Sequence, residues 1–66
     1  MKIILNGKSQ ECAESTRLKS IIEQFCKDTR HVIAEVNGAI VKNTAWSEKN
    51  LADGDVVELV NFVGGG

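Results

Sequence analysis

Residues 56–66 read VVELVNFVGGG, an apolar run from Val56 to Val63 that leads directly into three glycines. The β-branched content of the run predicts a β-strand. Apolar side chains occupy both alternating sets of positions along it, which is the pattern of a strand in the middle of a sheet. We therefore expect this strand to be central, with other strands paired to both of its edges.

One helix can cover only one face of such a sheet. If Val57 and Leu59 point toward the helix, then Val60 and Phe62 point to the opposite side. An exposed apolar patch close to the end of the chain is typical of a surface that docks a partner. We therefore predict that Val60, Phe62 and Val63 contact a partner protein. The alternative is that a loop of the chain itself covers part of this face.

The three glycines predict that the chain works through its end. Gly64, Gly65 and Gly66 have no Cβ atoms, so they can thread a channel too narrow for other residues. The last four residues reach about 13–14 Å when extended, which is enough to enter the active site of another protein. We predict a folded domain over residues 1–63 and a flexible tail over residues 64–66. The alternative is a frayed terminus or an expression remnant without a role.

Two Asn-Gly pairs predict tight β-hairpins, because both residues tolerate the positive φ that a type I′ turn needs. Each pair is flanked by runs that fit short strands. The first hairpin joins Met1–Leu5 to Lys8–Cys12 through Asn6-Gly7, and the second joins Val32–Val36 to Ala39–Val41 through Asn37-Gly38.

The segment between the hairpins has the period of an amphipathic helix. We expect Thr16 to cap its start and the helix to end near Asp28. A polar connection follows the second hairpin, and we expect its Trp46 to pack over the core. The predicted apolar helix face consists of Leu18, Ile21, Ile22, Phe25 and Cys26.

Length and charge exclude several classes of protein. The 66 residues allow one small domain with little room for an internal catalytic cavity. The net charge is −1 and the eight basic residues are scattered, which disfavours nucleic-acid binding. The longest apolar run is far shorter than the roughly 20 residues of a membrane span, and no signal peptide opens the chain. We therefore expect a cytoplasmic protein.

The cysteines and the histidine show no spacing typical of a metal or redox site. Cys12 and Cys26 do not form a Cys-x-x-Cys pair, and His31 is the single histidine. We expect both cysteines to pack as small apolar side chains and His31 to be solvated. The chain also has no phosphate-binding loop, nucleophile elbow or paired carboxylates. We therefore expect no metal, no bound cofactor and no catalytic residue in this chain.

The order of two hairpins, one helix and a last central strand in so short a chain is that of a β-grasp, or ubiquitin-like, fold. We thus expect an α+β protein with a mixed sheet of four to five strands packed on one helix. The whole chain resembles the ThiS family of thiamine-biosynthesis sulfur carriers. The resemblance rests on MKIILNG at 1–7, Thr16-x-Leu18, Asn37-Gly38, Trp46, LADGD at 51–55 and FVGGG at 62–66.

The resemblance implies a specific chemistry for the end of the chain. In this family a ThiF-type adenylyltransferase uses Mg-ATP to convert the last glycine to an acyl-adenylate, and a persulfide donor then supplies sulfur to give a thiocarboxylate. The thiocarboxylate passes its sulfur to the thiazole synthase ThiG. By this resemblance Gly66 carries the sulfur, Gly64 and Gly65 thread the partner's site, and ATP and magnesium belong to the partner. The family needs only two terminal glycines, so the role of Gly64 stays open.

Three other functions stay open from the sequence. A MoaD-like sulfur carrier for molybdopterin synthesis shares the fold, although members of that type tend to be longer and to carry a proline near the tail. A non-covalent β-grasp binding module would use the face of Val60 and Phe62 and not the glycines. A protein modifier would join Gly66 to a lysine of another protein. An autonomous enzyme is the function that the sequence favours least.

Overall fold

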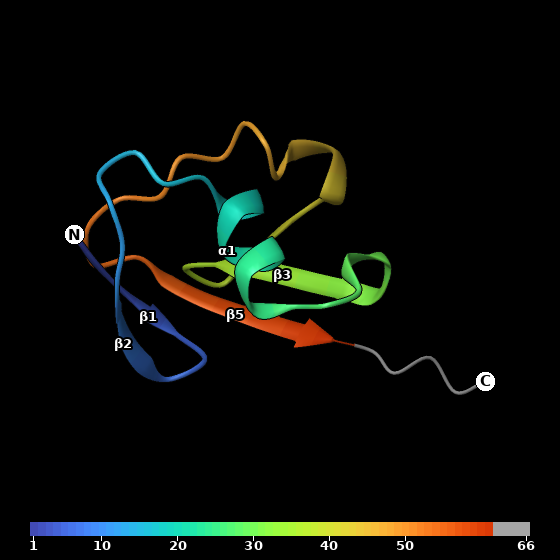
Figure 1. The fold of residues 1–66 in the computed structure, drawn as a ribbon, viewed down its shortest axis with the longest axis horizontal. Coiled ribbons are helices and arrows are strands. Elements are labelled where there is room, and N and C mark those ends of the chain that lie inside the picture. Colours follow the sequence, from blue (N-terminus) through green and yellow to red (C-terminus); the bar gives the residue numbers. More distant parts are fainter. Residues whose placement is uncertain (62–66) are drawn as a thin grey trace.

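The computed structural model describes residues 1–61, which form a small α+β domain (Figure 1). Its strands are β1 (Lys2–Leu5), β2 (Lys8–Glu11), β3 (Val32–Val36), β4 (Ala39–Val41) and β5 (Val56–Asn61). The α-helix, α1, spans Leu18–Phe25, and two 3-10 helices, η1 and η2, span Thr29–His31 and Asn43–Ala45. The predicted order of strands and helix is therefore confirmed.

Strand β5 is central in the sheet, as its apolar pattern predicts. The order of strands is β2-β1-β5-β3-β4. Strand β5 runs parallel to β1, with Val57 opposite Leu5, and antiparallel to β3, with Val57 opposite Val36. The two Asn-Gly turns close antiparallel hairpins between β1 and β2 and between β3 and β4. The predicted mixed sheet packed on one helix is therefore confirmed, with five strands.

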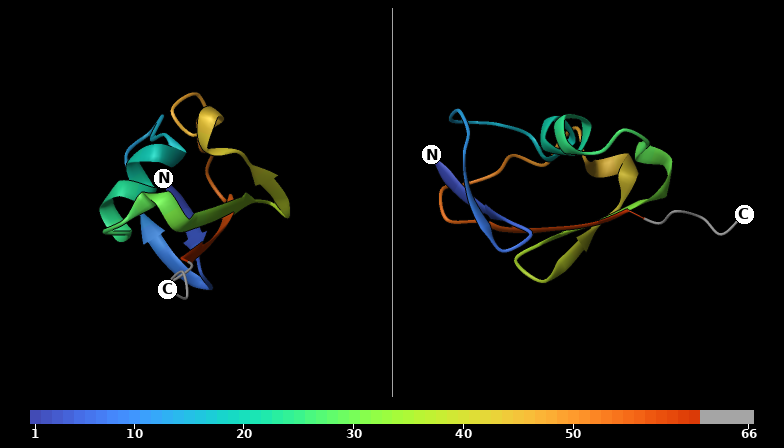
Figure 2. Two further views of the ribbon diagram at one scale, coloured as in Figure 1. Left: turned by 90° about the vertical axis from the view of Figure 1, so that its right-hand side faces the viewer. Right: turned by 60° about the horizontal axis from the view of Figure 1, so that its bottom comes forward.

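The helix and the connection between β4 and β5 lie on the same side of the sheet (Figure 2). Trp46 in this connection is buried, and its Nε1–H donates a hydrogen bond to the Val41 carbonyl oxygen at 2.9 Å. The predicted packing role of Trp46 is therefore confirmed. The core beneath the helix contains Ile3, Leu5, Leu18, Ile21, Ile22, Val32, Ala34, Val36, Trp46, Leu51 and Val57.

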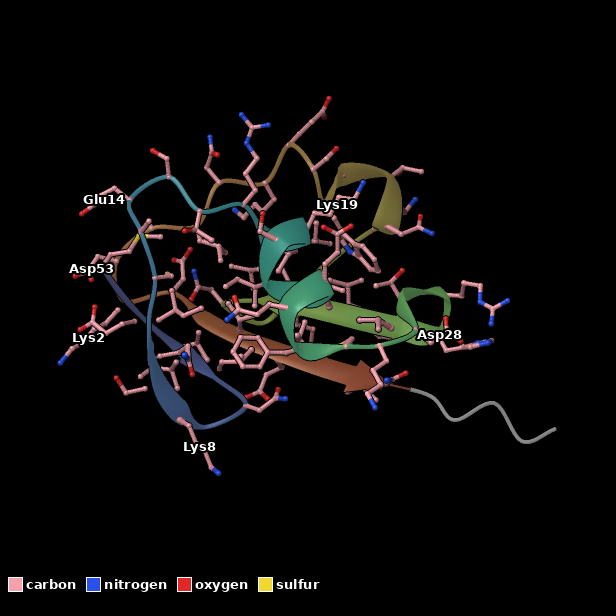
Figure 3. The ribbon with its side chains drawn as sticks, in the orientation of Figure 1. Lys2, Lys8, Glu14, Lys19, Asp28 and Asp53 are labelled. Carbon is pink, nitrogen blue, oxygen red and sulfur yellow. The ribbon has the colours of Figure 1, made fainter. Side chains whose placement is uncertain are left out.

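Charged side chains project from the periphery of the domain, away from this core (Figure 3). No polar side chain among the described residues is both buried and without a hydrogen-bond partner. The core is therefore apolar, and its stability comes from the burial of aliphatic surface and one tryptophan. The charged side chains labelled in Figure 3 are Lys2, Lys8, Glu14, Lys19, Asp28 and Asp53.

The start of the helix differs from the prediction. Arg17, not Thr16, holds the N-cap position, and its side chain makes no capping hydrogen bond. The hydroxyl of Thr16 donates instead to the Ala13 carbonyl oxygen at 2.6 Å. The N–H of Leu18 is satisfied by the Lys49 carbonyl oxygen at 2.9 Å, so the chain before the helix pairs with the connection that precedes β5. A capping side chain is not needed because distant carbonyls take its place.

The helix also ends earlier than predicted, at Phe25. Cys26 already has an extended backbone, with φ −123° and ψ 125°, and it packs half-buried against the core. Asp28 belongs to the next element, where its Oδ1 accepts the N–H of Arg30 at 3.0 Å and caps η1. Hydrogen bonds from the Arg30 side chain and backbone hold the pKa of Asp28 well below its usual range. The predicted face is correct for its first three residues, but Phe25 is 46% exposed.

The side chains of the two turn asparagines accept hydrogen bonds from the backbone of β5, one at each edge of the strand. Asn6 and Asn37 have φ values of 49° and 53°, a left-handed conformation that asparagine tolerates better than most residues. The Oδ1 of Asn37 accepts the N–H of Val56 at 2.9 Å. The Oδ1 of Asn6 accepts the N–H of Leu59 at 2.8 Å. Because β1 ends at Leu5, the Asn6 side chain supplies an acceptor that β1 itself no longer provides.

Asp55 organises the turn that leads into β5. Its Oδ2 accepts the Ala52 N–H at 2.8 Å, and its Oδ1 accepts an N–H of the Asn37 side chain at 3.0 Å. The Ala52 backbone hydrogen bond, supported by the Asn37 side chain, lowers the pKa of Asp55 below its usual value, although partial burial acts in the opposite direction. The carboxylate therefore joins the β3–β4 turn to the entry of the central strand.

We predict that Asn6→Gly destabilises the domain by about 1 kcal/mol, because Leu59 loses a hydrogen bond while the left-handed backbone becomes easier to form. Urea unfolding followed by the fluorescence of Trp46 measures the change. Asn6→Asp is the matched control, since it keeps an oxygen acceptor at the same position. Equal stability of Asn6→Gly and the wild type would show that the side-chain hydrogen bond contributes nothing.

We also predict that the stability gap between the wild type and Asp55→Asn depends on pH. A folded-state pKa below the unfolded value of about 3.9 adds stability above that value, and this stability is lost as pH falls through the folded pKa. The wild type should therefore be the more stable protein at neutral pH, and the gap should narrow as the pH falls below about 4. Thermal unfolding across this range tests the prediction, and a gap that stays constant would contradict it.

Candidate functional site

Strand β5 carries the part of the predicted site that the structure describes. Val60 lies in this strand, which ends at Asn61 opposite Val32 of β3. The other predicted site residues, Phe62, Val63, Gly64, Gly65 and Gly66, lie outside the described residues, as does the proposed boundary between domain and tail.

The side of the sheet away from α1 carries exposed apolar residues, as the sequence predicts. Val60 is 51% exposed and lies directly opposite Ile33, which is 37% exposed. Ile4 and Val56 form a second exposed pair, one on β1 and one on β5. Ile40 on β4 is 66% exposed. Here the outer face means the outward-pointing side chains on this side of β1, β5, β3 and β4. They are the exposed Ile4, Ile33, Ile40, Val56, Glu58 and Val60 and the half-buried Glu35.

Two glutamates in the middle of the outer face were not predicted as site residues. Glu35 of β3 and Glu58 of β5 are register partners, so their side chains leave the sheet on the same side and next to each other. The alternation of VIAEV and VVELV places each glutamate among outward-facing positions. The register between β3 and β5, which the sequence alone does not give, is what places the two glutamates opposite each other.

The outer face also borders a hollow at the edge of the sheet. The hollow has a volume of about 390 Å³ and lies where β3 extends past the end of the shorter β4. Ile33 and Ile40 contribute to its lining, and Arg30 and Lys42 stand at its side. A large side chain of a docked partner would have space there next to the apolar residues.

The structure also places the two cysteines and the histidine that were considered from the sequence. Cys12 and Cys26 are free thiols, half-buried against the core, and His31 is exposed at the end of η1. Within residues 1–61, no three His, Cys, Asp or Glu side chains gather closely enough to hold a metal ion. No helix in the same part of the chain is both long and apolar enough to cross a bilayer.

One helix packed on a five-stranded mixed sheet, with the last strand central and its outer face apolar, defines a ubiquitin-like β-grasp domain. The arrangement is shared with a solved structure of the thiamine biosynthesis protein ThiS from Geobacter metallireducens. That chain is 30% identical, the alignment covers 100% of both chains, and the TM-score is 0.85.

The sequence model of the ThiS family matches residues 3–66, and this chain belongs to the ThiS family. The sulfur carrier protein ThiS of Bacillus subtilis is 35% identical over 63 residues, which cover 94% of this chain and 96% of the relative. A thiazole synthase of Paramagnetospirillum magneticum is 32% identical over 66 residues. This chain spans about a fifth of the length of that thiazole synthase, 20%, so the similarity concerns one segment of a larger protein.

Proposed function

We propose that this chain carries sulfur for synthesis of the thiazole ring of thiamine, as a thiocarboxylate on Gly66. The observation that carries the proposal is family membership over residues 3–66, which includes the terminal glycines. The apolar outer face, on the central strand that leads toward those glycines, supports a role in which the chain is handled by partner proteins. We infer that the chain is a protein co-substrate without catalytic residues of its own, and that it acts in the cytoplasm.

The chemistry begins with a carboxylate, which is a poor acyl donor because its charge repels nucleophiles and oxide is a bad leaving group. A ThiF-like adenylyltransferase, which binds ATP and magnesium itself, joins the Gly66 carboxylate to AMP and releases pyrophosphate. The terminal sulfur of a persulfide donor then attacks the carbonyl carbon, and AMP leaves. A thiol cleaves the resulting sulfur–sulfur bond, which leaves the thiocarboxylate on Gly66 and a disulfide on the donor side.

The chain itself contributes a small domain that docks and glycines that enter the partner. Val60 and its neighbours on the outer face, together with Phe62 and Val63, would hold the domain against the adenylyltransferase. Gly64 and Gly65 would pass through the narrow entrance, because they have no Cβ atoms. A ThiG-like thiazole synthase would then accept the sulfur. The similarity to one segment of a thiazole synthase supports this partner, since a carrier and its acceptor benefit from being held together.

We predict that the full chain gains the mass of one sulfur in exchange for one oxygen when it is incubated with a cognate adenylyltransferase, Mg-ATP and a persulfide source. Intact-protein mass spectrometry measures the gain, and fragmentation locates it on Gly66. The same spectrum of the untreated protein verifies that Gly66 carries the terminal carboxylate. A chain without Gly65 and Gly66 has no terminal glycine pair, so it should keep its fold and should not gain sulfur.

Other results would point to the alternative functions. A folded chain that gains no sulfur beside an active enzyme would contradict the proposal, and unchanged partner binding without Gly66 would then favour a non-covalent binding module. Conjugates of higher mass in cells would indicate a protein modifier. Sulfur transfer to molybdopterin synthesis, and not to thiazole synthase, would indicate a MoaD-like carrier.

We predict that Val60→Asp weakens binding to the adenylyltransferase by at least about tenfold, because an unpaired charge would be buried at the interface. Isothermal titration calorimetry measures the affinity, and thermal unfolding verifies the fold. Phe25→Asp is the matched control, since Phe25 is exposed to a similar extent, 46% against 51%, but belongs to α1 on the other side of the sheet. Similar affinities of the two variants would remove Val60 from the docking surface.

A further inference from the structure

We propose that the outer face selects its partner by charge, and that the adenylyltransferase places an arginine or lysine side chain between Glu35 and Glu58. This inference rests on the proposed function, because it concerns the same docking surface. It goes further in assigning a specificity-determining pair of residues and the chemistry of the group that they bind.

Glu35 and Glu58 are neighbours across β3 and β5, and neither forms an ion pair within residues 1–61. Glu35 and Glu58 are directly opposite in antiparallel strands, where Cβ atoms are typically about 4.5–5.5 Å apart. Like charges at such positions are destabilising. The ion pairs among residues 1–61 involve Glu11 and Asp28, and none involves Glu35 or Glu58. The folded domain therefore holds an uncompensated negative pair, which a cation from outside would stabilise.

Apolar side chains surround this pair on the outer face. Val56 and Val60 flank Glu58 along β5, Ile33 lies two residues before Glu35 on β3, and Ile40 of β4 is directly opposite Glu35. Burial of these side chains by a partner would exclude water from the carboxylates. Coulomb interactions are stronger in a medium of lower dielectric constant, so a cation inside this ring gains more than one in open solvent.

The same arrangement acts against partners that lack a cation. An apolar surface without a basic group would bury two like charges unpaired, at a large cost in desolvation. The glutamates therefore convert a sheet face that could bind many apolar surfaces into one that discriminates among them. Arginine fits the pair best, because its planar guanidinium can donate to two carboxylates at once.

Charge also argues against two other occupants of the outer face. A second copy of this chain docked through the same face would bring four carboxylates together around the symmetry axis. A nucleic acid would oppose the same carboxylates with its phosphates. A protein surface that is apolar and carries a positive group is the occupant that the face complements.

The test compares the double variant Glu35→Gln/Glu58→Gln with the wild type, using the full chain and the adenylyltransferase. Calorimetry at low and at high salt measures the affinity, and thermal unfolding measures the stability of the free chain. The double variant Glu14→Gln/Glu48→Gln is the matched control, because it removes the same net charge from exposed positions outside the outer face.

We expect the Glu35→Gln/Glu58→Gln variant to be at least as stable as the wild type when free, since a repulsion has been removed. Its affinity at low salt should fall by at least about tenfold, and most of the salt dependence of binding should disappear. The control variant should bind like the wild type. A destabilised variant would contradict the uncompensated pair, and an unchanged affinity would contradict the cation between the glutamates.

Failure of this inference can be separated from failure of the proposed function. If the wild type gains sulfur and the variant binds the enzyme equally well, the charge pair has no role in docking and the sulfur-carrier proposal stands. If the wild type neither binds the adenylyltransferase nor gains sulfur, both the proposed function and the assigned occupant are wrong. If the variant loses affinity only for thiazole synthase, the pair selects that enzyme and the assignment to the adenylyltransferase is overturned.

Discussion

The fold depends on the central position of β5, which must find hydrogen-bond partners on both of its edges. Strand β3 supplies one edge along five register pairs, from Val36↔Val57 to Val32↔Asn61. Strand β1 supplies the other edge over two pairs only, because it turns at Asn6-Gly7. The side chain of Asn6 then extends this second edge by accepting the Leu59 N–H. Asn6 thus forms part of the turn between β1 and β2, and it also completes the hydrogen bonding of β5, which follows about fifty positions later.

The central position of β5 also divides its side chains between the core and the outer face. Val57 is fully buried beneath the helix, whereas Val56, Glu58 and Val60 point to the outer face. A 66-residue domain buries only about 60% of its unfolded surface, so it cannot cover both faces of its sheet. The uncovered face is therefore a cost in free-state stability, and the adjacent glutamates add to that cost. Both are consistent with a surface that is completed by a partner.

The features fixed by short-range rules could be predicted from the sequence. The bounds of β3 and β4 are correct because the Asn37-Gly38 turn sets their register within a few residues, and β5 is central because its own pattern requires it. The predicted cap at the start of α1 was wrong because the carbonyl of Lys49, about thirty residues away, accepts a hydrogen bond from the N–H of Leu18. The pairing of Glu35 with Glu58 was missed for a similar reason. Both depend on which distant segments meet, and local patterns do not contain that information.

More hydrogen bonds hold the start of β5 than its end. This difference determines what a docked partner would do to the strand. Asn37 and Asp55 fix the start of the strand through three hydrogen bonds. One joins their two side chains, one runs from the Val56 N–H to Asn37, and one runs from the Ala52 N–H to Asp55. Beyond Leu59, whose N–H is bound by Asn6, the described pairing of the strand comes from β3 alone. A partner that covers Val60 therefore contacts the half of the strand that the domain supports least. If the proposed docking holds, binding at Val60 would fix the end of β5 at Asn61, from which the chain leads to Gly66. The position of the outer face would then set how accurately the proposed carrier group is delivered.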